Sequence, residues 1–152
     1  MKKDTHTVAK KLEDTEKIAK SFLSTVLKIK SKNAIVVGMY GDLGTGKTTF
    51  VKNIAKILNV KKKVNSPTFV IIKKYLIKSK NHTHLFHIDA YRLKSAKEIK
   101  ILGWEEMVSN PKHLVFIEWP ERIIKAMPKH HQMIFISHRK DGYRNFEIRI
   151  NK

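Results

Sequence analysis

Gly41-Asp42-Leu43-Gly44-Thr45-Gly46-Lys47-Thr48 is the stretch of sequence that decides the fold. It follows the pattern of a phosphate-binding loop: glycine, four residues of any type, glycine, lysine, and then serine or threonine. An apolar run of strand length, residues 34–39, precedes it, and apolar residues recur at helical spacing after it. The sequence therefore predicts a strand, a phosphate loop and a helix, in that order.

This context makes the loop a site for a polyphosphate. The N-terminus of a helix exposes backbone N–H groups that have no intrahelical partner, and it carries a partial positive charge that attracts anions. Glycines allow the backbone to wrap closely around the phosphates. Lys47 supplies a point charge for the β- and γ-phosphates, and the Thr48 hydroxyl stands where this motif binds Mg²⁺.

Length and composition narrow the class of protein. At 152 residues, the chain is expected to form one domain, residues 1–152, that buries about two thirds of its unfolded surface. The absence of cysteine excludes disulfides, thiolate metal sites and cysteine nucleophiles. The basic N-terminus leads into no apolar signal region and no apolar run is long enough to cross a membrane, so we expect a soluble cytoplasmic protein.

The formal net charge of +19 invites the hypothesis of nucleic-acid binding, because polyanions bind basic surfaces by releasing counterions. Only five of the 32 basic residues are arginine, the better bidentate phosphate ligand, and the lysines are spread through every segment. A general lysine bias would give the same composition. The sequence favours a solvated lysine-rich surface but leaves direct nucleic-acid binding open.

The phosphate-loop motif and the hydrophobic periodicity together predict an α/β fold of the P-loop NTPase type. We expect a three-layer sandwich with a mixed central sheet, helices on both faces, and an antiparallel hairpin at the C-terminus. Strands are expected at residues 7–12, 34–39, 69–77, 85–88, 114–117, 132–137 and 144–150, and helices at 15–29, 47–59, 95–102, 104–108 and 120–124. The run 114–117 is apolar throughout, as in a strand buried on both faces.

Magnesium beside Thr48 needs a carboxylate from a second strand. Glu118 follows four buried apolar residues, which is a Walker B arrangement with glutamate as the acid. We assign Glu118 to magnesium, directly or through water. Trp119, the next residue, is expected to form a wall of the site.

Asp89 ends another strand and is followed closely by Tyr91 and Arg92. Asp89 is predicted either to order the attacking water or to act in the outer shell of magnesium. Arg92 either stabilises transition-state charge or pairs with Asp89 as a structural bridge. Thr68 is a candidate sensor of the γ-phosphate, with a turn hydroxyl that caps the backbone as the equal alternative.

Three histidines close in sequence suggest a metal cluster at first sight. Strand geometry argues against it, because a period of two puts His82 and His84 on one face and His87 on the other. A zinc site is therefore the less favoured interpretation.

Four motifs together resemble the TsaE (YjeE) family of bacterial ATPases. They are the loop with the following Thr49 and Phe50, then Ser66-Pro67-Thr68-Phe69, Asp89-x-Tyr91-Arg92-Leu93 and Glu118-Trp119-Pro120-Glu121. Their order and spacing are far more specific than a phosphate loop alone. The match departs at Ala90, where the family carries a larger apolar residue, and in the heavy positive charge.

The resemblance implies binding and slow hydrolysis of ATP with Mg²⁺, in support of threonylcarbamoyladenosine formation beside the anticodon of tRNAs. It implies that the TsaB–TsaD heterodimer is the partner, that tRNA is met only through that complex, and that hydrolysis resets the complex. The implied catalytic residues are Lys47, Asp89 and Glu118, and the implied magnesium ligands are Thr48 and Glu118. The motifs, their neighbours and the resemblance together predict these nucleotide-binding residues: Gly41, Asp42, Leu43, Gly44, Thr45, Gly46, Lys47, Thr48, Thr49, Thr68, Arg92 and Trp119.

Two other functions share some of these features. A small-molecule or nucleoside kinase of the P-loop class must shield its acceptor with an arginine-bearing lid. Arg122 and Arg139 are isolated here, and no insert of lid length separates the strands. A basic nucleic-acid module with a regulatory nucleotide site is the third hypothesis, and steep salt-dependent tRNA binding by the lone chain would favour it.

Overall fold

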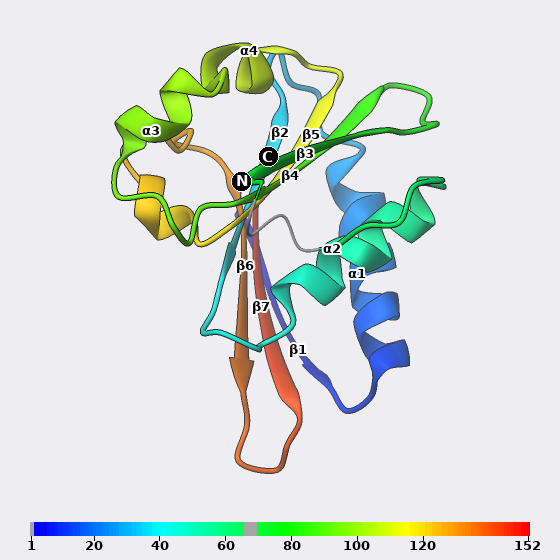
Figure 1. Ribbon diagram of the computed structural model, residues 1–152. Helices are drawn as coiled ribbons and strands as arrows, with labels where there is room; N and C mark the ends of the chain where they lie inside the picture. The colour runs from blue at the N-terminus through cyan, green and yellow to red at the C-terminus, as the bar shows by residue number, and fades with distance from the viewer. Residues whose placement is uncertain (1, 66–69) are drawn as a thin grey trace.

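A mixed seven-stranded sheet, in the order β1-β7-β6-β2-β5-β4-β3, forms the centre of the molecule (Figure 1). The computed structural model describes residues 2–65 and 70–152. The strands are β1 Lys2–Ala9, β2 Ile35–Tyr40, β3 Ile72–Leu76, β4 His84–Asp89, β5 His113–Glu118, β6 Gln132–His138 and β7 Arg144–Asn151. The helices are α1 Leu12–Val26, α2 Lys47–Ile57, α3 Ala96–Ile101, α4 Trp104–Ser109 and the 3₁₀ helix η1 Pro120–Ile123.

The four central strands, β6, β2, β5 and β4, run parallel to one another. The strands outside them pair antiparallel, as β3 with β4, β6 with β7 and β1 with β7. Parallel strands bring their carboxyl ends to the same edge of a sheet, and ligands bind in the crevice outside that edge. The phosphate loop, Asp89 and Glu118 all stand at this edge, because they follow or end β2, β4 and β5.

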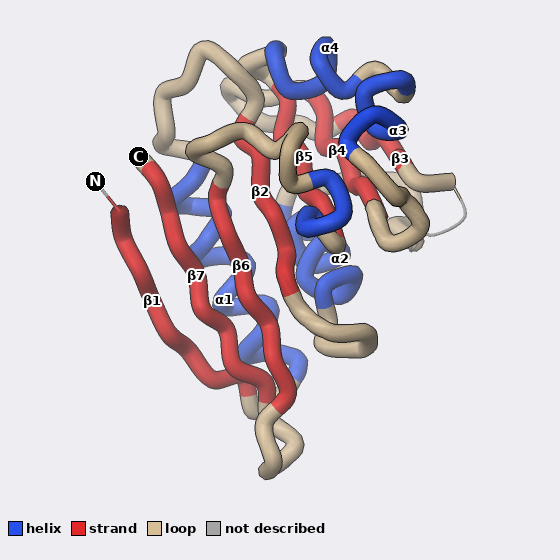
Figure 2. Tube along the Cα trace, turned by 90° about the vertical axis from the view of Figure 1, so that its left-hand side faces the viewer, coloured by secondary structure: helices blue, strands red, loops and turns tan. Residues whose placement is uncertain are grey.

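Helices cover both faces of the sheet, which confirms the predicted three-layer arrangement (Figure 2). The core on the side of α1 and α2 includes Phe22, Phe50, Phe116 and Phe146. The core on the side of α3, α4 and η1 is built around Trp104, which is 1% exposed. Strands β2 and β5 are buried on both sides for nearly their whole length, as their continuous apolar sequences require.

The edge strand predicted at residues 7–12 is wrong in its bounds. β1 begins five residues earlier, and it pairs with β7 from Lys2 opposite Asn151 to Ala9 opposite Arg144. Residues 2–7 are exposed, so no alternation of buried and solvated positions marks the strand in the sequence. α1 likewise begins at Leu12 rather than residue 15, because the Asp14 carboxylate accepts hydrogen bonds from the backbone N–H groups just before the helix.

The remaining elements agree with the sequence to within a few residues. α1 ends at Val26 rather than at residue 29, and β3 begins at Ile72 rather than at residue 69, which lies outside the described residues. The two antiparallel hairpins, β3–β4 and β6–β7, are confirmed, and β7 alternates between buried and more exposed positions.

In the part of the chain that the structure describes, no helix has the length and apolar composition to span a bilayer.

Candidate nucleotide-binding site

The phosphate loop runs from the end of β2 at Tyr40 to the start of α2 at Lys47. Two of its glycines are required by geometry. A Cβ on Gly41 would collide with the backbone oxygen of Ile136 in β6, so only glycine allows this approach of loop to sheet. Gly46 stands just before α2 with φ of 107°, a backbone region that side chains disfavour.

Lys47 is the first residue of α2 and is only 4% exposed. Its Nζ donates hydrogen bonds to the carbonyl oxygens of Gly41 and of Asp42, the latter at 2.8 Å. The same atom lies 4.3 Å from the centre of the Trp119 ring. Burial lowers the pKa of Lys47, and nearby carboxylates, Glu118 foremost, act in the opposite direction. The ammonium is thus desolvated and held beside the loop.

Glu118, at the end of β5, is 4% exposed and is held from two sides. The Thr48 hydroxyl donates to its Oε1 at 2.9 Å and approaches Oε2 at 3.1 Å. The Nε2 of His87 lies 2.7 Å from Oε2, and the His87 side chain has no exposed surface. The buried Nδ1 of His87 has no partner among the described residues, so we assign the proton to Nε2, which donates to the carboxylate.

Asp89 stands opposite Glu118 in the register of β4 and β5 and is 6% exposed. Its Oδ1 accepts a hydrogen bond from the backbone N–H of Tyr91 at 2.9 Å, which anchors the turn after β4. Two carboxylates therefore meet at the ends of neighbouring parallel strands. A hydroxyl and two carboxylates form a set of hard oxygen donors, which fits Mg²⁺.

Trp119 adopts a left-handed backbone conformation, with φ of 60° and ψ of 48°. That conformation costs a residue with a side chain about 1–2 kcal/mol. Pro120 follows and opens η1, and the Tyr91 ring packs against the indole at 5.0 Å between centres. The turn thus places the indole beside the Lys47 ammonium.

A hollow of about 250 Å³ gathers most of the predicted residues. Its described lining is Leu43, Gly44, Gly46, Lys47, Thr48, Thr49, Asp89, Glu118, Trp119 and Arg144. Gly41 and Asp42 contribute carbonyls to Lys47 instead, and the buried Thr45 donates its hydroxyl to the Asp42 carbonyl at 3.0 Å. Arg92 is exposed and is not among these lining residues. Thr68 lies outside the described residues.

A family model described as Threonylcarbamoyl adenosine biosynthesis protein TsaE matches residues 9–146, a range that holds every residue of this hollow. The chain belongs to the TsaE family. The resemblance seen in the four sequence motifs is thereby confirmed, and with it a place in the biosynthesis of threonylcarbamoyladenosine in tRNA.

Individual TsaE proteins match most of the chain. The protein of Haemophilus influenzae is 30% identical over 132 residues, which are 87% of this chain and 80% of that protein. TsaE of Bacillus subtilis is 36% identical over 132 residues, or 87% and 77% of the two chains. The crystal structure of Bacillus subtilis YdiB aligns with a TM-score of 0.74 and 28% identity, and covers 99% of this chain and 87% of that one. These matches support the P-loop NTPase fold.

Two residues near the phosphate loop are not among the site residues that the sequence predicts, His87 and Arg144. His87 precedes Asp89 by two positions in a strand, so alternation alone could have placed both on one face. Arg144 gives no such signal, because it meets the loop only through the order of strands in the sheet. Its Nη2 lies 3.5 Å from the Gly44 carbonyl oxygen, and its buried Nε has no hydrogen-bond partner among the described residues.

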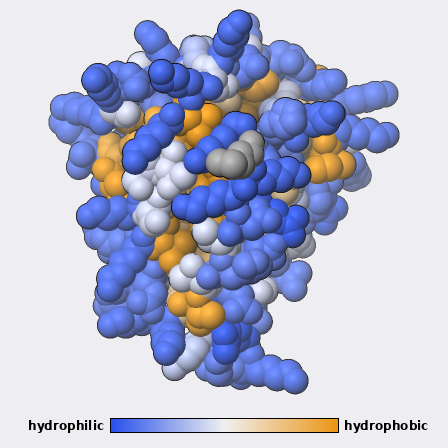
Figure 3. Space-filling view, turned by 180° about the vertical axis from the view of Figure 1, so that it is seen from behind, coloured by the Kyte–Doolittle hydropathy of each residue, from blue (hydrophilic) through white to orange (hydrophobic). Residues whose placement is uncertain are grey.

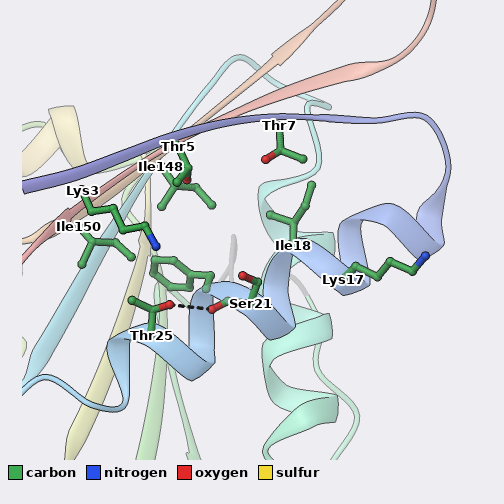
Figure 4. Close-up of a pocket in the computed structure, with 10 residues that line it drawn as sticks. Lys3, Thr5, Thr7, Lys17, Ile18, Ser21, Thr25, Ile148 and Ile150 are labelled. Atoms are coloured by element: carbon green, nitrogen blue, oxygen red, sulfur yellow. Dashed lines mark hydrogen bonds between the residues drawn. The ribbon is translucent and has the colours of Figure 1, made fainter.

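A second hollow, of about 300 Å³, lies between α1 and the β1–β7 edge (Figure 4). Ile18, Ile148 and Ile150 supply apolar surface there, and Lys3 extends from β1 toward the helix. The Thr25 hydroxyl donates to the Ser21 backbone carbonyl at 3.1 Å, so it is engaged within α1. None of the lining residues belongs to the phosphate loop or to the strand-end acids.

Proposed function

We propose that this chain binds ATP with Mg²⁺, hydrolyses it slowly alone, and acts with TsaB and TsaD in forming threonylcarbamoyladenosine on tRNA in the cytoplasm. One observation carries the proposal: Lys47, Thr48, Asp89 and Glu118 converge on one hollow at the carboxyl edge of the parallel strands. Phosphoryl transfer to water requires a loop that binds the phosphates and carboxylates that hold magnesium and orient the water, and this site has a phosphate loop and two strand-end carboxylates.

The loop and Lys47 bind the phosphates in this proposal. The backbone N–H groups at the start of α2 point toward the end of the loop, and the buried ammonium adds full positive charge. Lys47 donates to loop carbonyls, which a γ-phosphate oxygen replaces as acceptors. Gly44 has open space where a Cβ would stand, so polyphosphate oxygens approach the backbone there without hindrance, whereas the Cβ position of Gly46 faces the Arg144 side chain.

Thr48 and Glu118 would hold the magnesium ion, which neutralises charge on the phosphates. The Thr48 hydroxyl donates to Glu118 Oε1 at 2.9 Å, so the hydroxyl and the carboxylate are close enough to bind one ion together. His87 fixes the other carboxylate oxygen, so Glu118 needs little rearrangement. This rigid support suits a metal ligand better than a mobile proton acceptor.

Asp89 would orient the attacking water. One of its carboxylate oxygens accepts from the Tyr91 N–H, which fixes the rotation of the group. A carboxylate held in this way accepts a proton from water in a defined direction. The role of Arg92 as an electrostatic stabiliser stays a prediction, because Arg92 is an exposed residue and is not among the described lining residues of the hollow.

Release of inorganic phosphate from ATP, with and without TsaB–TsaD, tests the proposal. We expect slow release by the lone chain and a clear increase with the heterodimer, and we expect the ternary assembly to depend on ATP. Hydrolysis that is unchanged by the heterodimer, together with no assembly on size-exclusion chromatography, would contradict the partner role. Stoichiometric transfer of phosphate to a small acceptor would favour a kinase instead.

A further inference from the structure

Two lysine-lined hollows join around the C-terminal end of α2. One, of about 600 Å³, lies beside the last turns of the helix, and the other, of about 370 Å³, lies between the following turn and β3. They share residues 59–62, so they form one continuous depression, which we call the lysine groove. Its described lining contains seven lysines and no acidic residue: Lys52, Lys56, Lys61, Lys62, Lys63, Lys74 and Lys78.

The general excess of lysine in the chain does not by itself explain the charge of the lysine groove. Residues 43–88 contain ten lysines and no aspartate or glutamate, although the chain has 13 acidic residues in all. A bias toward lysine adds positive residues everywhere but does not remove acids from one region. The groove therefore lies in a segment of the chain whose charged residues are all positive.

Almost all of this charge is available to a ligand. The seven lysines are exposed. Lys56 pairs with Glu16 of α1 at 3.6 Å, but both side chains are largely in water, which screens such a pair and leaves it weak. Lys52 and Lys56 lie four residues apart and so extend from the same face of α2, one and two turns beyond Thr48.

A groove whose only charged lining residues are lysines suits phosphates better than a protein partner. Protein interfaces are depleted in lysine and enriched in arginine and aromatic residues, whereas lysine binds phosphate as a point charge. Seen from behind, the molecule is mostly hydrophilic, and hydrophobic residues show only in separate areas (Figure 3). The family acts in tRNA modification, so RNA is the polyanion at hand.

We propose that the lysine groove binds the phosphate backbone of RNA directly. The chain then contacts tRNA itself instead of meeting it only through partner proteins. The contact is independent of base sequence, because lysines that line an open groove read charge and spacing rather than base edges. It lies on the same helix whose first turn forms the candidate nucleotide site.

The test compares two triple variants of equal net charge. Lys61→Gln/Lys62→Gln/Lys63→Gln removes three groove lysines, and Lys94→Gln/Lys97→Gln/Lys100→Gln removes three exposed lysines at α3, which covers the opposite face of the sheet. Binding of fluorescently labelled, unmodified tRNA to each full-length chain is measured by anisotropy over a range of KCl concentrations. ATP affinity and thermal unfolding of each variant serve as controls for folding.

We expect the groove variant to bind tRNA at least about tenfold more weakly, with the slope of log affinity against log salt reduced by about 2, since each phosphate contact contributes roughly 0.7–0.9 to that slope. The α3 variant should lose less than about twofold. Equal losses in both variants, or no tRNA binding by the wild-type chain, would overturn the proposal. Unchanged tRNA binding with lost binding to TsaB–TsaD would assign the groove to a protein instead. None of these outcomes bears on ATP binding.

Discussion

Glu118 is held from two sides in the candidate site. Thr48 reaches it from the first turn of α2 and His87 from the neighbouring strand, so the carboxylate has a fixed direction. A buried carboxylate with both oxygens occupied by hydrogen bonds is costly to remove, because its partners are then left unsatisfied. A variant that tests the catalytic role of Glu118 should therefore keep the size and shape of this side chain.

Glu118→Gln should separate ATP binding from ATP turnover. The amide keeps the size and an acceptor for Thr48 but removes the negative charge that a magnesium ligand needs. We expect the hydrolysis rate to fall by about a hundredfold or more, the range that follows the loss of one key electrostatic group. The dissociation constant for ATP should change by less than about tenfold. Equal turnover by variant and wild type would remove the role given to Glu118.

His87 should act as a positioning residue for Glu118. His87→Gln keeps an N–H donor near the carboxylate, whereas His87→Leu leaves the buried carboxylate without it, at a cost of about 1–3 kcal/mol. We expect His87→Leu to raise the Mg²⁺ concentration needed for half-maximal ATP hydrolysis, and His87→Gln to restore part of the loss. If both variants need wild-type Mg²⁺ and are equally less stable, His87 has only a packing role.

Arg144 should strengthen nucleotide binding, because its guanidinium lines the hollow and its Nε lacks a partner among the described residues. Arg144→Gln is expected to weaken ADP and ATP binding by about tenfold. A hydrogen bond to a charged group contributes about 1.5 kcal/mol, and a tenfold change in affinity corresponds to about 1.4 kcal/mol. Arg149→Gln is the control, since Arg149 lies on the same strand and pairs with Glu147. Calorimetric titration of both variants would show no difference if Arg144 makes no nucleotide contact.

Among the helices and strands, the sequence predicts best those that have a clear hydrophobic period and a buried face. The strand, loop and helix at residues 35–57 were clear because an apolar strand, a glycine motif and a helical stripe come in sequence. The predicted bounds of β1 are wrong because most of this edge strand is exposed, so its sequence shows no alternation of apolar and polar residues. The left-handed Trp119 could not be foreseen either, because nothing in its residue type favours that conformation.

The turn between β5 and η1 should show the strain of Trp119. Glycine tolerates φ of 60° and alanine does not, so Trp119→Gly should exceed Trp119→Ala in free energy of unfolding by about 1 kcal/mol. The same pair of substitutions at Arg122, an exposed residue inside η1, should have the opposite order. Urea denaturation measures all four. Trp119→Ala as stable as Trp119→Gly would mean that the turn relaxes and is not strained.

On the scale of the whole molecule, the site is a product of sheet order. The loop, Asp89 and Glu118 are separated in sequence but adjacent in space because β2, β5 and β4 are parallel neighbours. The sequence indicated strand-end acids but not which strands are adjacent. Arg144 is the clearest consequence, since it reaches the loop from β7, a strand two positions from β2 in the sheet.

The central claim is that one triphosphate binds where β2 turns into α2. Calorimetric titration of the full-length chain with Mg²⁺ and a non-hydrolysable ATP analogue, for wild type and Lys47→Ala, tests it most directly. We predict one bound nucleotide per wild-type chain and no measurable binding to Lys47→Ala, with thermal unfolding showing that the variant is folded. Equal binding by both chains, or none by the wild type, would contradict the account.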